Sequence, residues 1–217
     1  AVLTTGTQAK TAGALATVDK KRANKFVSAG FFLALIVGIV FFFIYFFATE
    51  SVALRLGNQI DESVKNNIVD YLKGFSICLP FYVINGVIRP TVILDGNRKL
   101  VIFSLITIIG LTILGNFINV NYVNGGIFGI GVSTSIAYVV STLLLLTHFF
   151  LRKKSVLKIS HKFFDRHIAW ELIKRGSINI TKTVANSLFQ LYTNIVLLQI
   201  GGQASLTILG IQASCFT

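Results

Sequence analysis

The chain has 217 residues, of which 53% are hydrophobic and 13% are charged, and its mean hydropathy is +0.74. Soluble domains usually carry about 25% charged residues, so this composition excludes a soluble globular fold and indicates a membrane protein. The net charge of +12 would suit a nucleic-acid-binding protein, but the basic residues sit in short clusters between long uncharged runs. We therefore expect an all-α, polytopic bundle of membrane helices that lies in a lipid bilayer and binds no nucleic acid.

Long apolar runs predict the membrane spans, because a helix needs about 20 mostly apolar residues to cross a bilayer. The first 18 residues end one span, and Gln203 starts another. Between them, spans are predicted at 26–49, at 71–91 with Pro80 near its middle, within 100–151, and at 176–200. The run 100–151 is too long for one span, and its polar segment 119–126 divides it into two. The segment 51–70 is predicted to be a polar loop, and 95–99 a tight turn.

Lysines and arginines orient these spans. Five lie in 10–25, two in 98–99 and eight in 152–175, whereas the connections around Asn121 and Gly201 have none. Basic and neutral connections alternate, as the positive-inside rule requires. We therefore expect a multi-pass protein of the plasma membrane, with 152–175 on the cytoplasmic side.

The basic segment also contains a helical repeat. Phe164, Ile168 and Leu172 recur at four-residue spacing, with Trp170 beside them. This predicts a short amphipathic helix on the cytoplasmic leaflet. A linker helix between two bundles is the interpretation we prefer over a lipid-sensing element.

The sequence lacks the patterns of enzymes and cofactor-binding proteins. It has no P-loop or Rossmann glycine pattern, and none of its three histidines has a second ligand at metal spacing. Cys78 lies in an apolar stretch, where packing is its expected role. We expect no enzymatic activity and no resident cofactor or metal.

Polar residues line one face of several predicted spans. At 100° per residue, Thr112, Asn116 and Asn119 fall within an arc of about 60°. Such stripes form hydrogen bonds between helices or line a water-accessible cavity that binds a solute, and the sequence leaves both readings open. The candidate substrate-binding residues are Asn85, Thr112, Asn116, Asn119, Thr134, Tyr138, Asn186, Gln190 and Asn194.

No carboxylate is predicted in the middle of a span, because all eight acidic residues lie in loops or at span ends. An ion-coupled transporter usually needs such a group. Any ligands of a coupling ion are therefore expected outside this segment. Arg89 and Lys182 enter spans, and we expect both to extend toward the cytoplasmic interface.

Several short motifs follow one another in a recognisable order: GALATVDKKRA at 13–23, DGNRK at 95–99, GIFGIGVST at 126–134, and GGQAS at 201–205 before Gly210 and Ile211. In these the chain resembles the multidrug and toxic compound extrusion (MATE) family of antiporters. The resemblance implies two six-helix lobes in a full protein that exchanges small organic cations for protons or sodium, and we expect a monomer. The chain also begins at Ala1 without methionine, so we expect an interior piece, from the end of span two to the start of span eight.

The resemblance also implies a domain division. Residues 1–151 correspond to an amino-terminal lobe without its first span, 152–175 to a cytoplasmic linker, and 176–217 to the start of a carboxy-terminal lobe. Thr134 matches the family's threonine in span six. The chain departs from the family where Thr112 and Asn116 stand in place of an Asn and an Asp in span five, and where Asn186 or Ser187 stands in place of a glutamate in span seven.

Two other functions stay open. A flippase for lipid-linked sugars, from the same superfamily, would share the helices and have a more cationic cavity. A membrane scaffold without transport activity would direct its polar stripes at other helices and away from water.

Overall fold

The computed structural model describes residues 2–56, 62–151, 155–160 and 165–177, with scattered positions between 181 and 196. Its elements there are all helical. They are α1 (Val2–Ala16), α2 (Lys20–Leu56), α3 (Glu62–Ser76), α4 (Leu79–Leu94), α5 (Arg98–Ile118), the π-helical turn η1 (Asn119–Val123), α6 (Gly126–Leu151) and α7 (Arg166–Ser177). Within the described part, the expected all-α membrane bundle is confirmed.

Among the described residues, three stretches are long and apolar enough to cross a membrane: Lys20–Ser51, Arg98–Val123 and Gly126–Leu151. Large apolar side chains cover their outer surfaces; Phe47 is 74% exposed and Ile113 is 65% exposed. In water such a surface would drive aggregation, so these faces are suited to lipid. The division of 100–151 into two spans is also confirmed, since η1 and the residues after it separate α5 from α6.

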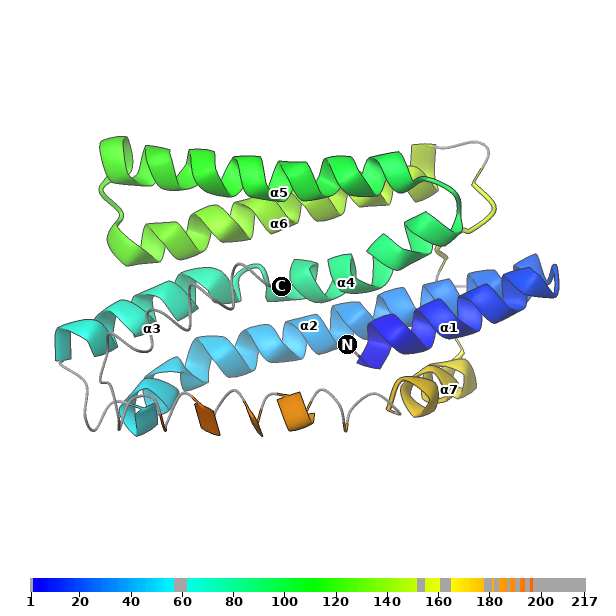
Figure 1. Cartoon of the computed structure of the whole chain (residues 1–217), viewed down its shortest axis with the longest axis horizontal. Helices are drawn as coiled ribbons and strands as arrows, with labels where there is room; N and C mark the ends of the chain where they lie inside the picture. Colours follow the sequence, from blue (N-terminus) through cyan, green and yellow to red (C-terminus); the bar gives the residue numbers. More distant parts are fainter. Residues whose placement is uncertain are drawn as a thin grey trace.

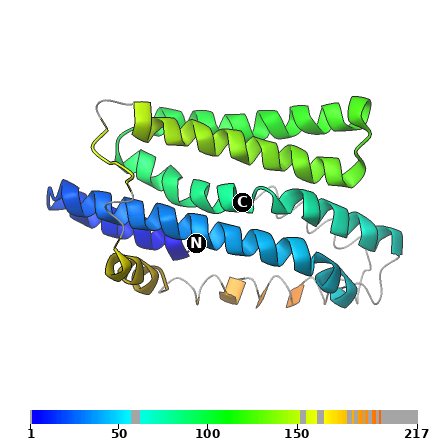
Figure 2. The same ribbon diagram turned by 180° about the vertical axis from the view of Figure 1, so that it is seen from behind.

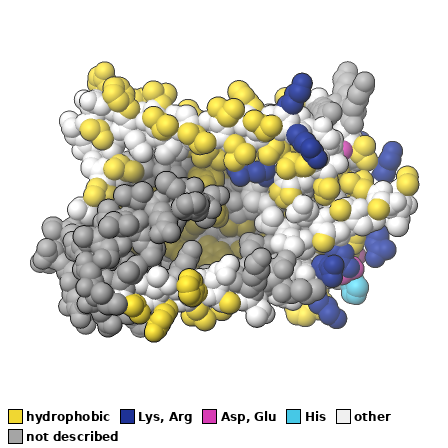
Figure 3. Space-filling view, viewed as in Figure 1, with side chains coloured by type: hydrophobic (Ala, Val, Ile, Leu, Met, Phe, Trp, Pro, Cys, Tyr) yellow, Lys and Arg dark blue, Asp and Glu magenta, His cyan; other side chains and the backbone are white. Residues whose placement is uncertain are grey.

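The helices lie in three rows (Figure 1). The antiparallel pair α5 and α6 forms one side, α3 and α4 follow each other in the middle, and α1 and α2 form the other side, with α7 beside α1 (Figure 2). The turns α1–α2 and α4–α5 and the helix α7 gather at one end of the bundle, where basic side chains are concentrated (Figure 3). The alternation of basic and neutral connections in the sequence therefore corresponds to two opposite ends of the bundle.

The span predicted at 71–91 is a broken one. Helices α3 and α4 are bent by 54° at the break between Ser76 and Leu79. Pro80 lies in the first turn of α4, where its missing N–H would have no helical partner in any case. Cys78 sits at the break and is fully buried, in agreement with its predicted packing role.

The loop predicted at 51–70 is wrong. Helix α2 continues to Leu56, and α3 begins at Glu62. The polar residues of α3 belong to one face of an amphipathic helix, while its other side packs against α6 and α2. Gly74 and Gly131 allow this contact, because a Cβ on Gly131 would lie 2.5 Å from the carbonyl oxygen of Tyr71.

Candidate functional site

A cavity of about 440 Å³ opens between α1, α2, α4 and α6. Its volume falls within the range of small-molecule sites. A hollow with hydrophobic side chains at its base is visible on this face of the molecule (Figure 3). The residues that line the cavity are Val2, Leu3, Thr4, Val37, Phe41, Tyr82, Val83, Asn85, Gly86, Val87, Arg89 and Tyr138.

Arg89 is the one charged residue among these described lining residues. Its Nε atom is buried and has no hydrogen-bond partner within the described part of the chain. The sequence suggested that this side chain would extend to the cytoplasmic interface, but the structure places it on the wall of the cavity. A guanidinium here gives the cavity a positive electrostatic character.

Asn85 and Tyr138, both predicted site residues, lie on the same cavity. The Asn85 side chain is 1% exposed, and its Nδ2 donates to Ser141 Oγ and Thr142 Oγ1, each at 3.2 Å. Because these bonds join α4 to α6, Asn85 fixes the wall on which Arg89 stands. Tyr138 packs edge-to-face on Tyr82, with ring centroids 5.2 Å apart.

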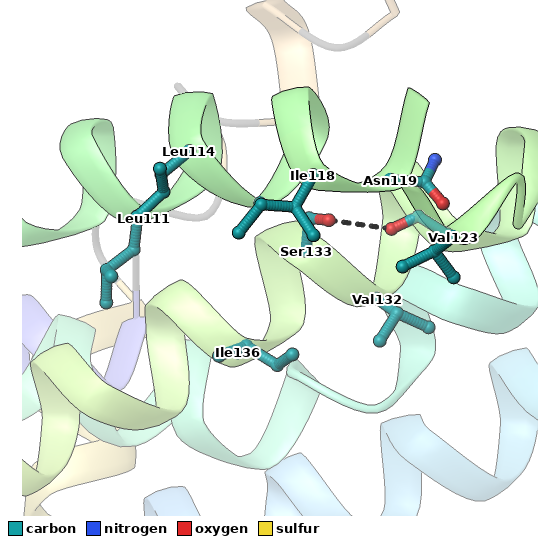
Figure 4. Close-up of a pocket in the computed structure, with 10 residues that line it drawn as sticks. Leu111, Leu114, Ile118, Asn119, Val123, Val132, Ser133 and Ile136 are labelled. Atoms are coloured by element: carbon teal, nitrogen blue, oxygen red, sulfur yellow. Dashed lines mark hydrogen bonds between the residues drawn. The ribbon is translucent and has the colours of Figure 1, made fainter. Parts of the chain in front are cut away.

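A second cavity, of about 330 Å³, lies between α5 and α6. Its walls are mainly apolar, with Leu111, Leu114 and Ile136 among them, and the Ser133 hydroxyl donates at 2.8 Å to the Gly129 carbonyl within α6 (Figure 4). Asn119 and Ser133 are the polar side chains among its described lining residues, and none of these lining residues is charged, so the cavity is poorly suited to a charged solute.

Asn119, a third predicted site residue, closes the turn between α5 and α6. Its Nδ2 donates to the Gly126 carbonyl at 2.8 Å, and its Oδ1 accepts from the Gly125 N–H at 3.1 Å. The turn contains two left-handed residues, Asn124 and Gly126, which are types that tolerate positive φ. These contacts give Asn119 a structural role.

Thr112 and Asn116 line neither of the two cavities described above. The Thr112 Oγ1 and Asn116 Oδ1 atoms are buried without a hydrogen-bond partner among the described residues. Thr134 donates to the Ile130 carbonyl of its own helix at 3.2 Å. The structure therefore does not bring these three residues together with Asn85 and Tyr138 in one cavity.

The remaining predicted residues lie toward the end of the chain. Asn186 is helical and exposed. Gln190 and Asn194 lie outside the described residues, as do Lys182 and Ser187. Of the predicted span at 176–200, Gly176 and Ser177 end α7, and the scattered described positions between 181 and 196 are helical.

Sequence reasoning missed a buried polar cluster at the basic end of the bundle. Asp95 and His148 have side chains that are 3% and 0% exposed, with His148 Nε2 2.7 Å from Asp95 Oδ2. The Asp95 carboxylate also accepts from the Ser155 hydroxyl and from the Val156 N–H, the latter at 3.0 Å. This carboxylate therefore joins the α4–α5 turn, the end of α6 and the segment after it.

The hydrogen bonds define the tautomer of His148. Asn97 caps α5 by accepting from the Leu100 N–H through Oδ1, at 3.4 Å. Its Nδ2 therefore faces His148 Nδ1, at 3.1 Å. An amide nitrogen only donates, so Nδ1 must accept, and the ring proton sits on Nε2, which donates to Asp95.

Helix α7 packs on the bundle through its predicted apolar face. Ile168 and Leu172 are buried against α1 and α2, whereas Trp170 is 66% exposed and does not join them. Phe164 lies outside the described residues. Protein, and not only a membrane surface, therefore covers the apolar face of this helix.

An ion pair and a close crossing attach α7 to α1. Lys10 on α1 donates to Glu171 on α7, and this hydrogen bond lowers the pKa of the Glu171 carboxyl below its ordinary value. A Cβ on Gly6 would overlap the carbonyl oxygen of Leu172. The two backbones touch because no side chain separates them.

One protein family and several solved structures match this chain. The sequence model of the MatE family matches residues 1–121. No curated protein matches the chain. Among solved structures, an inward-facing multidrug resistance MATE family transporter of the MOP superfamily has a TM-score of 0.83 at 19% identity, over 96% of this chain and 47% of that one.

An outward-facing MATE family transporter gives a TM-score of 0.82 at 20% identity, over 93% of this chain and 45% of that one. A third match is a MOP superfamily transporter from Pyrococcus furiosus, whose binding pocket is described as having a reverse polarity that suggests a different function. Its TM-score is 0.84 at 19% identity, over 96% of this chain and 46% of that one. At this identity the likeness shows the fold. The chain spans about half the length of these transporters.

Proposed function

Because this chain belongs to the MatE family of membrane transporters, we propose that it is part of a secondary transporter that moves amphipathic organic solutes by alternating access, in exchange for protons or sodium. The observation that carries the proposal is the cavity of about 440 Å³ between α1, α2, α4 and α6. It combines aromatic and aliphatic walls with polar side chains at fixed positions, as a site for an amphipathic solute requires.

The proposal concerns a longer protein in the plasma membrane, functioning as a monomer. Residues 1–151 would form most of one lobe, 152–175 the cytoplasmic linker, and 176–217 the start of a second lobe. Transporters of this kind move one bundle against another around a central site. Thr112, Asn116 and Thr134 are proposed to form a second polar site in the first lobe. The Thr112 and Asn116 oxygens, which are buried without a partner among the described residues, support this.

The test is transport by the full-length protein in proteoliposomes with an imposed proton or sodium gradient. We expect gradient-dependent movement of a fluorescent organic anion or a fluorescent organic cation. Empty liposomes and proteoliposomes without a gradient are the controls. If neither compound moves faster with a gradient in either direction, the proposed function is wrong.

A flippase for lipid-linked molecules is the second candidate. The position of Arg89 on the cavity wall favours it, because such head groups are anionic. Transfer of a fluorescent phospholipid between leaflets, read by quenching from outside, distinguishes the two. Lipid transfer without any gradient-dependent solute movement would support the flippase and contradict the solute transporter.

A further inference from the structure

The cavity carries a positive charge that the described protein does not neutralise. Arg89 lines it, its Nε is buried without a partner, and no described carboxylate forms an ion pair with it. An uncompensated cation inside a membrane protein is costly and usually faces a functional pathway. The missing counter-charge is therefore expected to arrive with a ligand.

The neighbouring polar groups limit what this ligand can be. The amide nitrogen of Asn85 is occupied by its two bonds to α6. Tyr82 and Tyr138 each add a phenolic hydroxyl that can donate. A guanidinium fork with additional O–H donors matches the oxygens of a carboxylate or a phosphate. An organic cation would meet the same charge as repulsion.

Apart from Thr4, the rest of the described cavity wall is apolar. The apolar lining residues include Val37 and Phe41 from α2 and Val83 and Val87 from α4. Such a wall buries hydrocarbon and gives no polar partner. The cavity thus has a charged region and an apolar region, which match the head group and the hydrocarbon of an amphiphile.

We propose that this cavity binds the anionic head group, a carboxylate or a phosphate, of an amphipathic solute, with Arg89 as the anchoring residue and the apolar wall holding the hydrocarbon. The inference rests on the proposed function and names its substrate class. It replaces the organic cation that the family resemblance implied with a ligand of opposite charge.

The test compares two probes that differ in head-group charge, hexyl phosphate and hexyltrimethylammonium, by calorimetric titration of the full-length protein in an uncharged detergent. We expect Arg89→Gln to weaken hexyl phosphate binding at least tenfold and to leave hexyltrimethylammonium unchanged or tighter. Arg89→Lys keeps the charge without the fork and should give an intermediate loss. Arg98→Gln, a change at an exposed arginine at the start of α5, is the matched control and should resemble the wild type.

The proposal is overturned if the wild type does not bind hexyl phosphate, or if folded Arg89→Gln binds it as the wild type does. Should Arg89→Gln fail to fold, Arg89→Lys decides, and wild-type affinity in that variant would overturn the proposal. Phosphatidic acid in nanodiscs identifies the source of the anion: competition with hexyl phosphate indicates a lipid head group, and no competition indicates a soluble organic anion.

The same variants separate this inference from the proposed function. If the wild-type protein shows no gradient-driven transport but binds hexyl phosphate in an Arg89-dependent way, the proposed function is contradicted and the anion site is supported. If Arg89→Gln alters neither gradient-driven cation transport nor hexyl phosphate binding, the anion site is contradicted and the proposed function is supported.

Discussion

Replacing Asp95 by the isosteric Asn should destabilise the protein, because Asp95 accepts from His148 through Oδ2 and from the Val156 N–H through Oδ1, whereas an amide has only one accepting oxygen. Asn97 already donates to His148 Nδ1, so the introduced amide would direct a second N–H₂ group at Nε2 or offer only a weaker neutral acceptor. A charge-assisted hydrogen bond contributes about 1.5–3 kcal/mol, and an unsatisfied buried donor costs about 1–3 kcal/mol. We expect a total loss of about 3 kcal/mol.

At about 2–4 °C per kcal/mol for a chain of this length, the melting temperature should fall by about 6–12 °C. The measurement is thermal unfolding of the detergent-purified protein, followed by the helical circular dichroism signal. The matched control is the double variant Asp95→Asn with Asn97→Asp, called the exchange variant. In it, the amide donates to His148 Nε2 and the new carboxylate accepts from Nδ1–H, so the imidazole again has one donor and one acceptor. The new Asp also retains an N-cap for α5.

The exchange variant should recover at least half of the lost melting temperature. The tautomer assignment is refuted if Asp95→Asn lowers the melting temperature by less than about 2 °C, or if the exchange variant melts no higher than the single variant.

Three further predictions follow from the bundle. Cysteines introduced at Lys99 and Tyr122, in a background without native cysteines, should react with an impermeant thiol reagent from opposite sides of the membrane. Reaction of both cysteines from the same side would contradict the predicted topology. Gly6→Ala should detach α7 and lower the melting temperature by several degrees, whereas Gly13→Ala, where a Cβ meets no atom within 4 Å, should be neutral. The lowered pKa of Glu171 implies a stabilisation that is complete above about pH 4.3 and is lost as the pH falls through the folded pKa, at most about 1 kcal/mol. Melting curves between pH 3 and pH 7 would check it, with Glu171→Gln expected to lack this pH-dependent step.

The helices and turns were largely predictable, because the patterns that define them are local. The apolar runs, the turn at 95–99 and the polar division at 119–126 each occupy neighbouring residues. The wrong prediction of a loop at 51–70 also has a local cause. The charged residues of this segment are typical of a loop, but in α3 they form one face of an amphipathic helix. Asn119 belonged to a polar stripe in sequence, but its contacts lie along the turn, which a helical wheel does not represent.

The site was less predictable, because its contacts join distant parts of the chain. Asp95 and His148 are 53 positions apart, and a turn residue and a histidine at a span end give no signal of pairing. Arg89 was assigned to the interface from its position near the end of a span. Its side chain lies on the cavity wall because α1, α2 and α6 pack around that part of α4, an arrangement that exists only in the folded bundle.

The backbone of the segment 155–160 is hydrogen-bonded to the bundle, and in the proposed transporter this would restrict where two lobes can pivot. The Lys158 N–H donates to Asn24 Oδ1 at 2.8 Å, and the Ser160 N–H donates to Ser28 Oγ at 3.1 Å. The Asp95 carboxylate also accepts from the Val156 N–H, and α7 packs on α1, so 155–160 and α7 are each attached to the bundle. In the proposed two-lobe transporter, a pivot before α7 would have to break these bonds in every transport cycle, whereas a pivot beyond Ser177 would leave them intact. The proposed linker would then move together with the first lobe.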